Sequence, residues 1–219
     1  VLDVGVGLRL LDLGAGTGKL TATLATLGHV TAVEPDPAML TELRHTLPNI
    51  PALPGSAEEI PLPDASVEAI LAGNAMHWFD MTTAGPEITR VLAPSGVLAG
   101  LWNVLDDSIE WVAELARISG PAVIGPRDTP ASWRTQTAAI HLPAGFTPPD
   151  LAHFPHTQRR TADTLVATLA TRAGVLVMPP RQRQTTLARI HAYLTSRPET
   201  AHGEFALPML TSVLRTQRQ

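Results

Sequence analysis

The stretch LDLGAGTGKL, residues 11–20, constrains the fold more than any other part of the chain. It joins an apolar run that ends at Asp12 and Leu13 to a helix-like segment, with three glycines in between. Glycine lets a backbone turn sharply and approach a ligand closely, as a nucleotide-type loop between a strand and a helix requires. The stretch therefore predicts the first strand–loop–helix unit of an α/β protein.

The first half of the chain continues this alternation of short apolar runs and helix-like segments. Strands are predicted at residues 8–13, 30–34, 50–53, 67–71 and 96–102, and helices at residues 18–27, 37–46 and 84–92, with a turn at residues 94–96. Such alternation indicates a doubly wound, mostly parallel, Rossmann-like sheet. A late antiparallel strand is expected at residues 205–214.

We expect residues 1–219 to form one domain, because an apolar fraction of 44% supports a full core. Residues 1–117 are expected to be its cofactor-binding core. Prolines interrupt residues 118–160, which predicts an irregular excursion that contributes to a substrate pocket. Residues 161–219 are expected to hold helices, at residues 163–172 and 181–195, and the closing strand.

Composition excludes several classes of function. The chain has no cysteine, so it has neither disulfides nor thiolate metal sites, and no histidine pair has metal-ligand spacing on a predicted helix. A formal charge of −4 disfavours nucleic acid as a partner. The sequence contains no run long enough for a membrane span and no signal-peptide pattern at its start, so a cytoplasmic location is expected.

Glu34 ends the second predicted strand, twenty residues after Gly14. A carboxylate there can accept hydrogen bonds from both hydroxyls of a ribose, which favours an adenosine-containing ligand. The dinucleotide fingerprint places its third glycine at position 19, where this chain has Lys19, with Gly18 one residue earlier. The spacing favours S-adenosylmethionine, which has no pyrophosphate, and Asp12 is a candidate partner for its ammonium group. The alternative is a glycine-rich turn that only connects strand and helix.

Several segments, in order and spacing, resemble the class I S-adenosylmethionine-dependent methyltransferase superfamily, and within it the small-molecule enzymes of the ubiquinone/menaquinone and trans-aconitate type. They are LDLGAGTGKLT (11–21), AVEPDPAML (32–40), GSAEEIPLPDASVEAI (55–70), AMHWFD (75–80), VLAPSGVLAGLWN (91–103) and LPMLTSVLR (207–215). That superfamily usually has one or two helices before the first strand that cover the cofactor. Because the strand begins within ten residues here, we expect this lid to be missing from the sequence.

The resemblance implies roles for individual residues. The glycines of residues 14–18 would bend around the methionine part of the cofactor, Glu34 would hold the ribose, and Pro35, Asp36 and Met39 would line the adenine side. In the loop that reads the adenine edge, the backbone of Ala57 can serve where Ser56 replaces the family's frequent aspartate. The implied cofactor-binding set is Asp12, Gly14, Ala15, Gly16, Thr17, Gly18, Glu34, Pro35, Met39, Ser56, Ala57, Glu58 and Asn74.

His77 is the candidate catalytic residue, because an imidazole can deprotonate a hydroxyl or orient a carboxylate acceptor. Trp78 and Phe79 could form an apolar or cation–π wall beside a sulfonium. The alternative is that these three residues pack the loop after the fourth strand. Further aromatic and polar residues that could contact an acceptor, or else belong to the core, are Trp102, Asn103, Trp111 and Trp133.

The sequence thus predicts methyl transfer from S-adenosylmethionine to a small molecule, with oxygen favoured over carbon or nitrogen as the acceptor atom. The identity of the acceptor and the oligomeric state stay open. Two alternatives are an NAD(P)-binding oxidoreductase, which shares the glycine loop and the acidic residue, and a non-catalytic relative that keeps the fold. Methylation of nucleic acid or protein is a weaker option, because the Asn-Pro-Pro-Tyr type motif of base methylation is absent.

Overall fold

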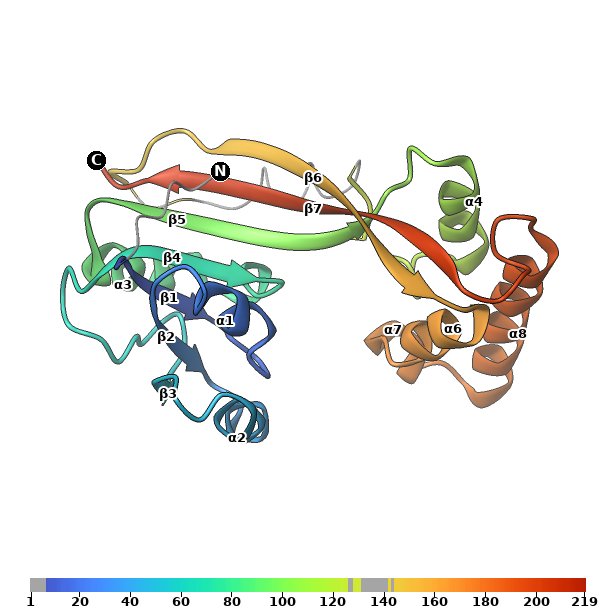
Figure 1. The fold of residues 1–219 in the computed structure, drawn as a ribbon, viewed down its shortest axis with the longest axis horizontal. Coiled ribbons are helices and arrows are strands. Elements are labelled where there is room, and N and C mark those ends of the chain that lie inside the picture. Colours follow the sequence, from blue (N-terminus) through green and yellow to red (C-terminus); the bar gives the residue numbers. More distant parts are fainter. Residues whose placement is uncertain (1–6, 126–127, 131–141, 143) are drawn as a thin grey trace. The chain divides into compact units, whose positions relative to one another are not determined.

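The computed structural model describes residues 7–125, 128–130, 142 and 144–219. Within them the chain forms a seven-stranded sheet of order β3-β2-β1-β4-β5-β7-β6 (Figure 1). The strands are β1 (Arg9–Leu13), β2 (His29–Glu34), β3 (Ala52–Pro54), β4 (Val67–Gly73), β5 (Leu92–Leu105), β6 (Asp150–Arg160) and β7 (Phe205–Gln217). The helices are α1 (Lys19–Leu24), α2 (Pro37–Thr46), the 3₁₀ helix η1 (Met76–Trp78), α3 (Met81–Val91), α4 (Glu110–Ser119), α6 (Ala162–Ala170), α7 (Ala173–Leu176) and α8 (Pro180–Ser196).

The first five strands are parallel, since β1 pairs with β2 and β4, β2 with β3, and β4 with β5. β7 runs antiparallel to β5. The amide of Arg218 bonds to the carbonyl of Gly96, whereas that of Asp106, at the other end of β5, bonds to the carbonyl of Pro208. The predicted mostly parallel sheet with a late antiparallel strand is confirmed.

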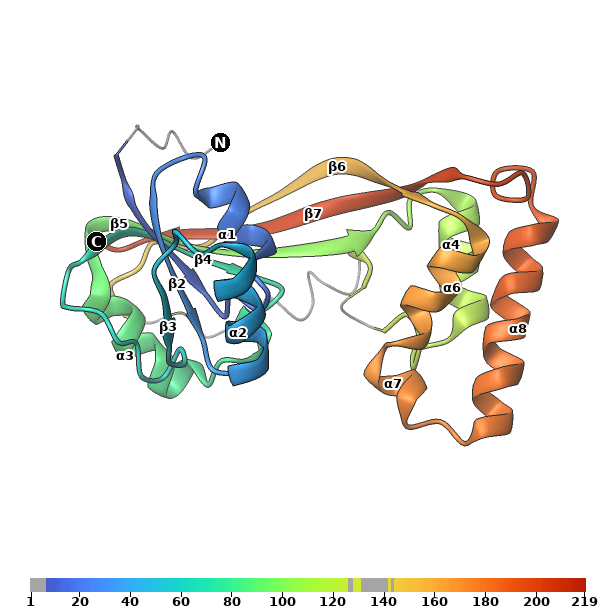
Figure 2. The same cartoon turned by 60° about the horizontal axis from the view of Figure 1, so that its bottom comes forward.

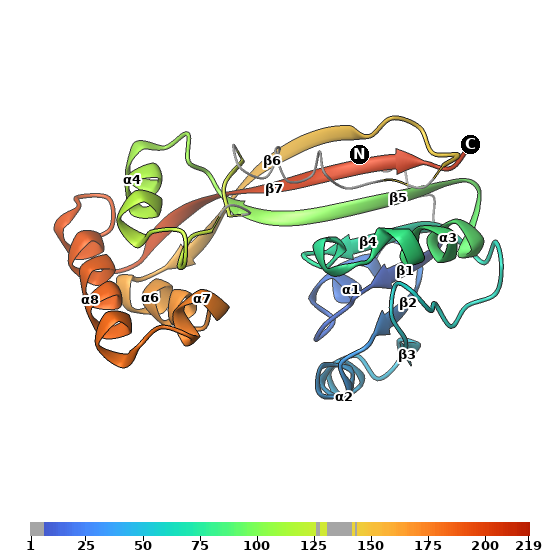
Figure 3. The ribbon, with the colours of Figure 1, turned by 180° about the vertical axis from the view of Figure 1, so that it is seen from behind.

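Helices cover both faces of the parallel strands, with α1 on one face and α3 on the other (Figures 1 and 3). α2 begins where predicted because the Asp36 carboxylate accepts from the amides of Ala38 and Met39 and Pro37 occupies the first turn. α1 is shorter than predicted and ends at Leu24. The turn that follows brings Gly28 close to the backbone of Leu8, where an added Cβ would lie 2.5 Å from the carbonyl oxygen.

The predicted turn at residues 94–96 is wrong, because these residues belong to β5. Ser95 does have the positive φ of a turn, 63°. In the pairing of β5 with β4, Leu92 lies opposite Val67 and Val97 lies opposite Ala69. The residues of β5 between these two pairs, Ser95 among them, therefore form a bulge that β4 does not match. The strand is kinked here and continues.

Residues 118–160 are less irregular than predicted, because β6 occupies their last eleven residues. α4 and α7 were not predicted at all. α6 and α8 agree with the helices predicted at residues 163–172 and 181–195 to within three residues at each end.

The chain divides into two compact units. Unit 1 comprises residues 1–102, 140–152 and 213–219, and unit 2 comprises residues 103–139 and 153–212. In unit 2, the helices α4, α6, α7 and α8 (Figure 2) enclose a separate apolar core in which Trp111 meets Phe205 edge to face. The expectation of a single domain stays a prediction. None of the described helices has the length and apolar character needed to cross a membrane.

Candidate functional site

The residues predicted to bind the cofactor lie in unit 1, at the edge of the sheet where its parallel strands end. The glycine loop, residues 14–18, follows β1, Glu34 is the last residue of β2, and Asn74 follows β4. The register places Leu13 beside Val33 and Asp12 beside Leu71, so these three ends are neighbours. Open α/β sheets bind ligands at this edge, at the point in the sheet where the order of the strands reverses.

The glycine loop takes a shape that other residues rarely adopt. Gly14, Gly16 and Gly18 all have positive φ, at 72°, 58° and 87°. A Cβ on Gly14 would lie 2.7 Å from the Cβ of Ala75, and one on Gly18 would lie 3.0 Å from Leu43, whereas at Gly16 the nearest atom is the sulfur of Met39 at 3.9 Å. The first and last glycines are therefore needed for packing, and the middle one borders open space.

Hydrogen bonds fix the loop to the sheet. The amides of Gly14 and Ala15 both donate to the carbonyl of Val33, at 2.9 and 3.0 Å, and the amide of Gly18 donates to the carbonyl of Ala15 at 3.0 Å. The amide of Gly16 donates to Glu34 Oε2 at 2.7 Å. The bend is thus formed by the chain's own contacts.

Glu34 is buried, with 5% of its surface exposed, and both of its oxygens have protein partners. Besides the bond from Gly16, Oε1 accepts from the amide of Asp36 at 2.9 Å. A carboxylate has about four lone-pair sites, so each oxygen can accept one further hydrogen bond. Two neighbouring acceptors of this kind, fixed beside an open glycine, fit a vicinal diol.

Asp12 lies beneath this edge, with 1% of its surface exposed, and its Oδ2 accepts from the hydroxyl of Thr21 at 2.6 Å. Burial raises the pKa of Asp12 to about 6; the bond from Thr21 opposes the rise and the nearby charge of Glu34 adds to it. Thr21 was not among the residues predicted from the sequence, although it lies in the first turn of α1, directly after the loop. The predicted contact of Asp12 with an ammonium group stays a prediction.

We expect Asp12→Asn to change how stability depends on pH. The ordinary pKa of 3.8 rises to about 6 on folding, so between these values the folded protein binds a proton that the unfolded chain releases. The free energy of unfolding should fall as pH rises through this window and level off above it. In Asp12→Asn this fall should disappear, leaving the variant roughly 3 kcal/mol more stable than wild type at neutral pH.

Urea denaturation at about pH 4.5 and about pH 7.5 measures this difference. Asp150→Asn, at an exposed position of unit 1, is the matched control and should follow wild type at both pH values. Parallel curves for wild type and Asp12→Asn would show that the buried carboxyl does not titrate in this window.

The remaining predicted adenine-side residues of unit 1 lie between β2 and the first turn of α2, where Met39 is helical, and on the loop after β3. Pro35, Asp36 and Met39 are exposed, and the carboxylate of Asp36 caps α2. On the other loop, Ala57 is buried, and the hydroxyl of Ser56 accepts from the amide of Glu58 at 3.2 Å. The Ser56 hydroxyl thus stabilises the turn of its own loop.

The segment after β4 packs against the glycine loop. Asn74 has a positive φ of 53°, and its amide donates to the carbonyl of Leu101 at 2.7 Å. The ring of Phe79 would lie 3.6 Å from a Cβ on Gly14, and Glu58 Oε1 accepts from the amide of Asp80 at 2.9 Å. These contacts join the segment after β4 to both the glycine loop and the adenine-side loop.

His77 and Trp78 lie in η1 within this segment. Their rings are 4.9 Å apart between centroids, and Trp78 has 75% of its surface exposed. The Nε1 of Trp102 donates to Nδ1 of His77 at 3.3 Å. Both residues are candidates from the sequence, but their contact with each other was not predicted.

The other residues considered for the acceptor have different positions. Trp111 belongs to the apolar core of unit 2, and the side-chain oxygen of Asn103 accepts from the hydroxyl of Thr211 at 2.9 Å. Trp133 lies outside the described residues. Among the described residues, no three His, Cys, Asp or Glu side chains group as metal ligands would.

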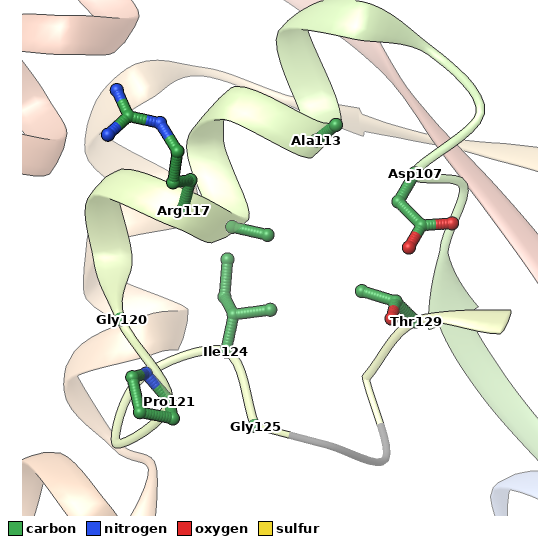
Figure 4. A pocket seen from close by; sticks show the side chains of 9 residues that line it. Asp107, Ala113, Arg117, Gly120, Pro121, Ile124, Gly125 and Thr129 are labelled. Carbon is green, nitrogen blue, oxygen red and sulfur yellow. The ribbon is translucent and has the colours of Figure 1, made fainter. Parts of the chain in front are cut away.

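Unit 2 contains a pocket of about 370 Å³ between α4 and the turns that follow it (Figure 4). Its lining residues are Asp107, Ala113, Ala116, Arg117, Gly120, Pro121, Ile124, Gly125 and Thr129. The pocket includes the start of the segment predicted to contribute to substrate binding. That contribution stays a prediction.

Comparison with known proteins agrees with this fold. Residues 11–100 match the family model described as a methyltransferase domain. The chain is 41% identical over 209 residues to the uncharacterized methyltransferase Rv3342 of Mycobacterium tuberculosis, covering 94% of this chain and 82% of the relative. It is 32% identical to the uncharacterized methyltransferase-like C25B8.10 of Schizosaccharomyces pombe, covering 87% of this chain and 73% of the relative.

Among solved structures, one from Anaeromyxobacter dehalogenans, described as a candidate type II methyltransferase, superposes with a TM-score of 0.67. It is 27% identical and covers 96% of this chain and 89% of its own. The chain belongs to the class I S-adenosylmethionine-dependent methyltransferase superfamily and is a methyltransferase.

Proposed function

We propose that the chain transfers a methyl group from S-adenosylmethionine to an oxygen atom of a small-molecule acceptor. The proposal that S-adenosylmethionine is the methyl donor is supported above all by Glu34. This buried carboxylate has one acceptor position left on each oxygen and is fixed beside the open space at Gly16. A ribose supplies the two hydroxyl donors that this arrangement lacks.

The other residues around the loop would hold the rest of the donor. Gly14, Gly16 and Gly18, together with Ala15 and Thr17, would bend around its methionine part, above the buried carboxyl of Asp12. Asn74 would face the methyl group. The adenine ring would lie between two groups of residues, which are Pro35, Asp36 and Met39 on one side and Ser56, Ala57 and Glu58 on the other.

S-adenosylmethionine, when bound, supplies a methyl group on a sulfonium, which needs little acid–base assistance. What the protein must add is alignment and the exclusion of water. The contacts of its segment with the glycine loop support a role for His77 in this alignment. Trp78 would give the donor or the acceptor an apolar face.

Oxygen is favoured as the acceptor atom because neither of the two carboxylates that bond within the segment of His77 forms a dedicated site for an amine. Asp80 accepts from the amide of Thr82, which holds the pKa of its carboxyl below the usual value, and Glu58 accepts from the amide of Asp80. Asp80 is also exposed, so water screens its attraction for an ammonium group. The net charge of −4 favours a small molecule over a nucleic acid.

Two measurements test the proposal. Isothermal titration should show saturable binding of S-adenosylmethionine and none of NAD, and a panel of hydroxyl, carboxyl and amine acceptors with radiolabelled donor should give labelled oxygen products. Binding of NAD without the methyl donor would overturn the donor assignment. Label that enters amines alone would overturn the choice of oxygen.

A further inference from the structure

The hydrogen bond from Trp102 to His77 joins two parts of unit 1 that are separated in sequence. Trp102 lies on β5 with 3% of its surface exposed, and His77 lies on η1, the segment that packs against the glycine loop. The indole Nε1 is 3.3 Å from Nδ1 of the imidazole.

The position of the indole is fixed by its packing. A Cβ on Gly100 would lie 2.4 Å from Cη2 and 2.7 Å from Cζ3 of Trp102, so the ring occupies the space that any other residue at position 100 would need. The same Cβ would lie 2.9 Å from the sulfur of Met76, which is 1% exposed and precedes His77 in the chain. The indole therefore has little freedom to turn its N–H elsewhere.

The chemistry of the two rings then determines the protonation of His77. An indole nitrogen only donates, so Nδ1 of His77 must accept and carries no proton in this arrangement. In the neutral imidazole the proton is then on Nε2. The far nitrogen of His77 is a hydrogen-bond donor in this state.

We infer that Trp102 is a positioning residue that holds His77 in the Nε2–H form, so that His77 acts as a hydrogen-bond donor toward the methyl acceptor and not as its base. This inference rests on the proposed function. A donor of this kind suits an acceptor oxygen that already carries its negative charge, because no proton then has to move to His77. The methyl group bonds to that oxygen, and the carbon–sulfur bond breaks with its electron pair going to sulfur.

The first test measures the protonation state without any ligand. Two-dimensional ¹⁵N NMR of the imidazoles in the full chain at neutral pH should show His77 with an unprotonated Nδ1 and a protonated Nε2. In Trp102→Phe this pattern should change toward a mixture of both forms. Trp111→Phe, at a buried indole of unit 2, is the matched control and should leave the His77 signals as in wild type. A protonated Nδ1 in the wild-type protein would overturn the inference.

The second test separates a donor from a base. A glutamine amide can place an N–H near the position of Nε2 but cannot accept a proton at neutral pH. We expect His77→Gln to keep methyl transfer within about tenfold of wild type, and His77→Ala to lose about 100-fold. Equal losses in the two variants would indicate a base. Titration with S-adenosylmethionine accompanies each assay, because absent binding in the wild type would refute the proposed function instead.

Discussion

Glu34→Ala should abolish measurable binding of S-adenosylmethionine. The substitution removes the two acceptor positions proposed for the ribose and also releases the amides of Gly16 and Asp36, which the carboxylate holds at 2.7 and 2.9 Å. Hydrogen bonds to a charged group contribute about 1.5–3 kcal/mol each, so losing two of them to the ligand weakens binding by at least about 100-fold. Isothermal titration of both proteins measures the difference.

Two variants define how this result is interpreted. Glu42→Ala removes an exposed carboxylate from α2 in the same unit and should bind the donor as wild type does. Glu34→Gln keeps the size of the side chain but loses one acceptor oxygen and the charge, so its affinity should lie between those of wild type and Glu34→Ala. Wild-type affinity in Glu34→Ala would remove the basis of the donor assignment.

Gly16→Val is expected to be the second large effect, with a loss of affinity of about 100-fold or more and a folded protein. The space beside Gly16 is open, with the sulfur of Met39 as its nearest atom at 3.9 Å, so the valine methyl groups would occupy room that a ligand needs. The backbone there has a φ of 58°, which costs a branched residue roughly 1–2 kcal/mol.

A valine at a second glycine distinguishes the effect of backbone strain from that of blocking the space for the ligand. Gly203 has a φ of 85° and nothing within 4 Å of an added Cβ. Gly203→Val should therefore lower the melting temperature about as much as Gly16→Val does, while donor affinity stays at the wild-type value. If both variants bind the donor equally well, Gly16 does not border the ligand.

The parallel half of the fold could be predicted from local signals. β1, β2 and α2 lie where the sequence analysis placed them, because an apolar run, a capping aspartate and a first-turn proline are all visible in a short window. The kink at Ser95 could not be predicted, since Pro-Ser-Gly is typical of a turn and only pairing with β4 keeps these residues in a strand. α4 was missed although Trp111, Val112 and Leu115 have helical spacing, because the prolines that follow drew the prediction toward irregular structure.

The sequence indicated many of the residues of the candidate site. It did not indicate most of the contacts between them. Gly14, Glu34 and Asn74 meet at one edge because parallel strands end together, which spacing alone predicts. The bond between Trp102 and His77 depends on the packing of Gly100 and Met76, and such packing leaves no periodic pattern in a sequence. The burial of Asp12 likewise became visible only with the structure.

The internal hydrogen bonds of the glycine loop also limit which ligands the site can bind. Loops that hold nucleoside phosphates do so by pointing several backbone N–H groups at the anion. Here the amides of Gly14, Ala15, Gly16 and Gly18 already donate to carbonyls or to Glu34. A triphosphate or pyrophosphate would meet a buried carboxylate in place of free donors. We expect the loop to act as a filter that keeps the cell's abundant phosphorylated adenosines from competing with a cofactor that carries none.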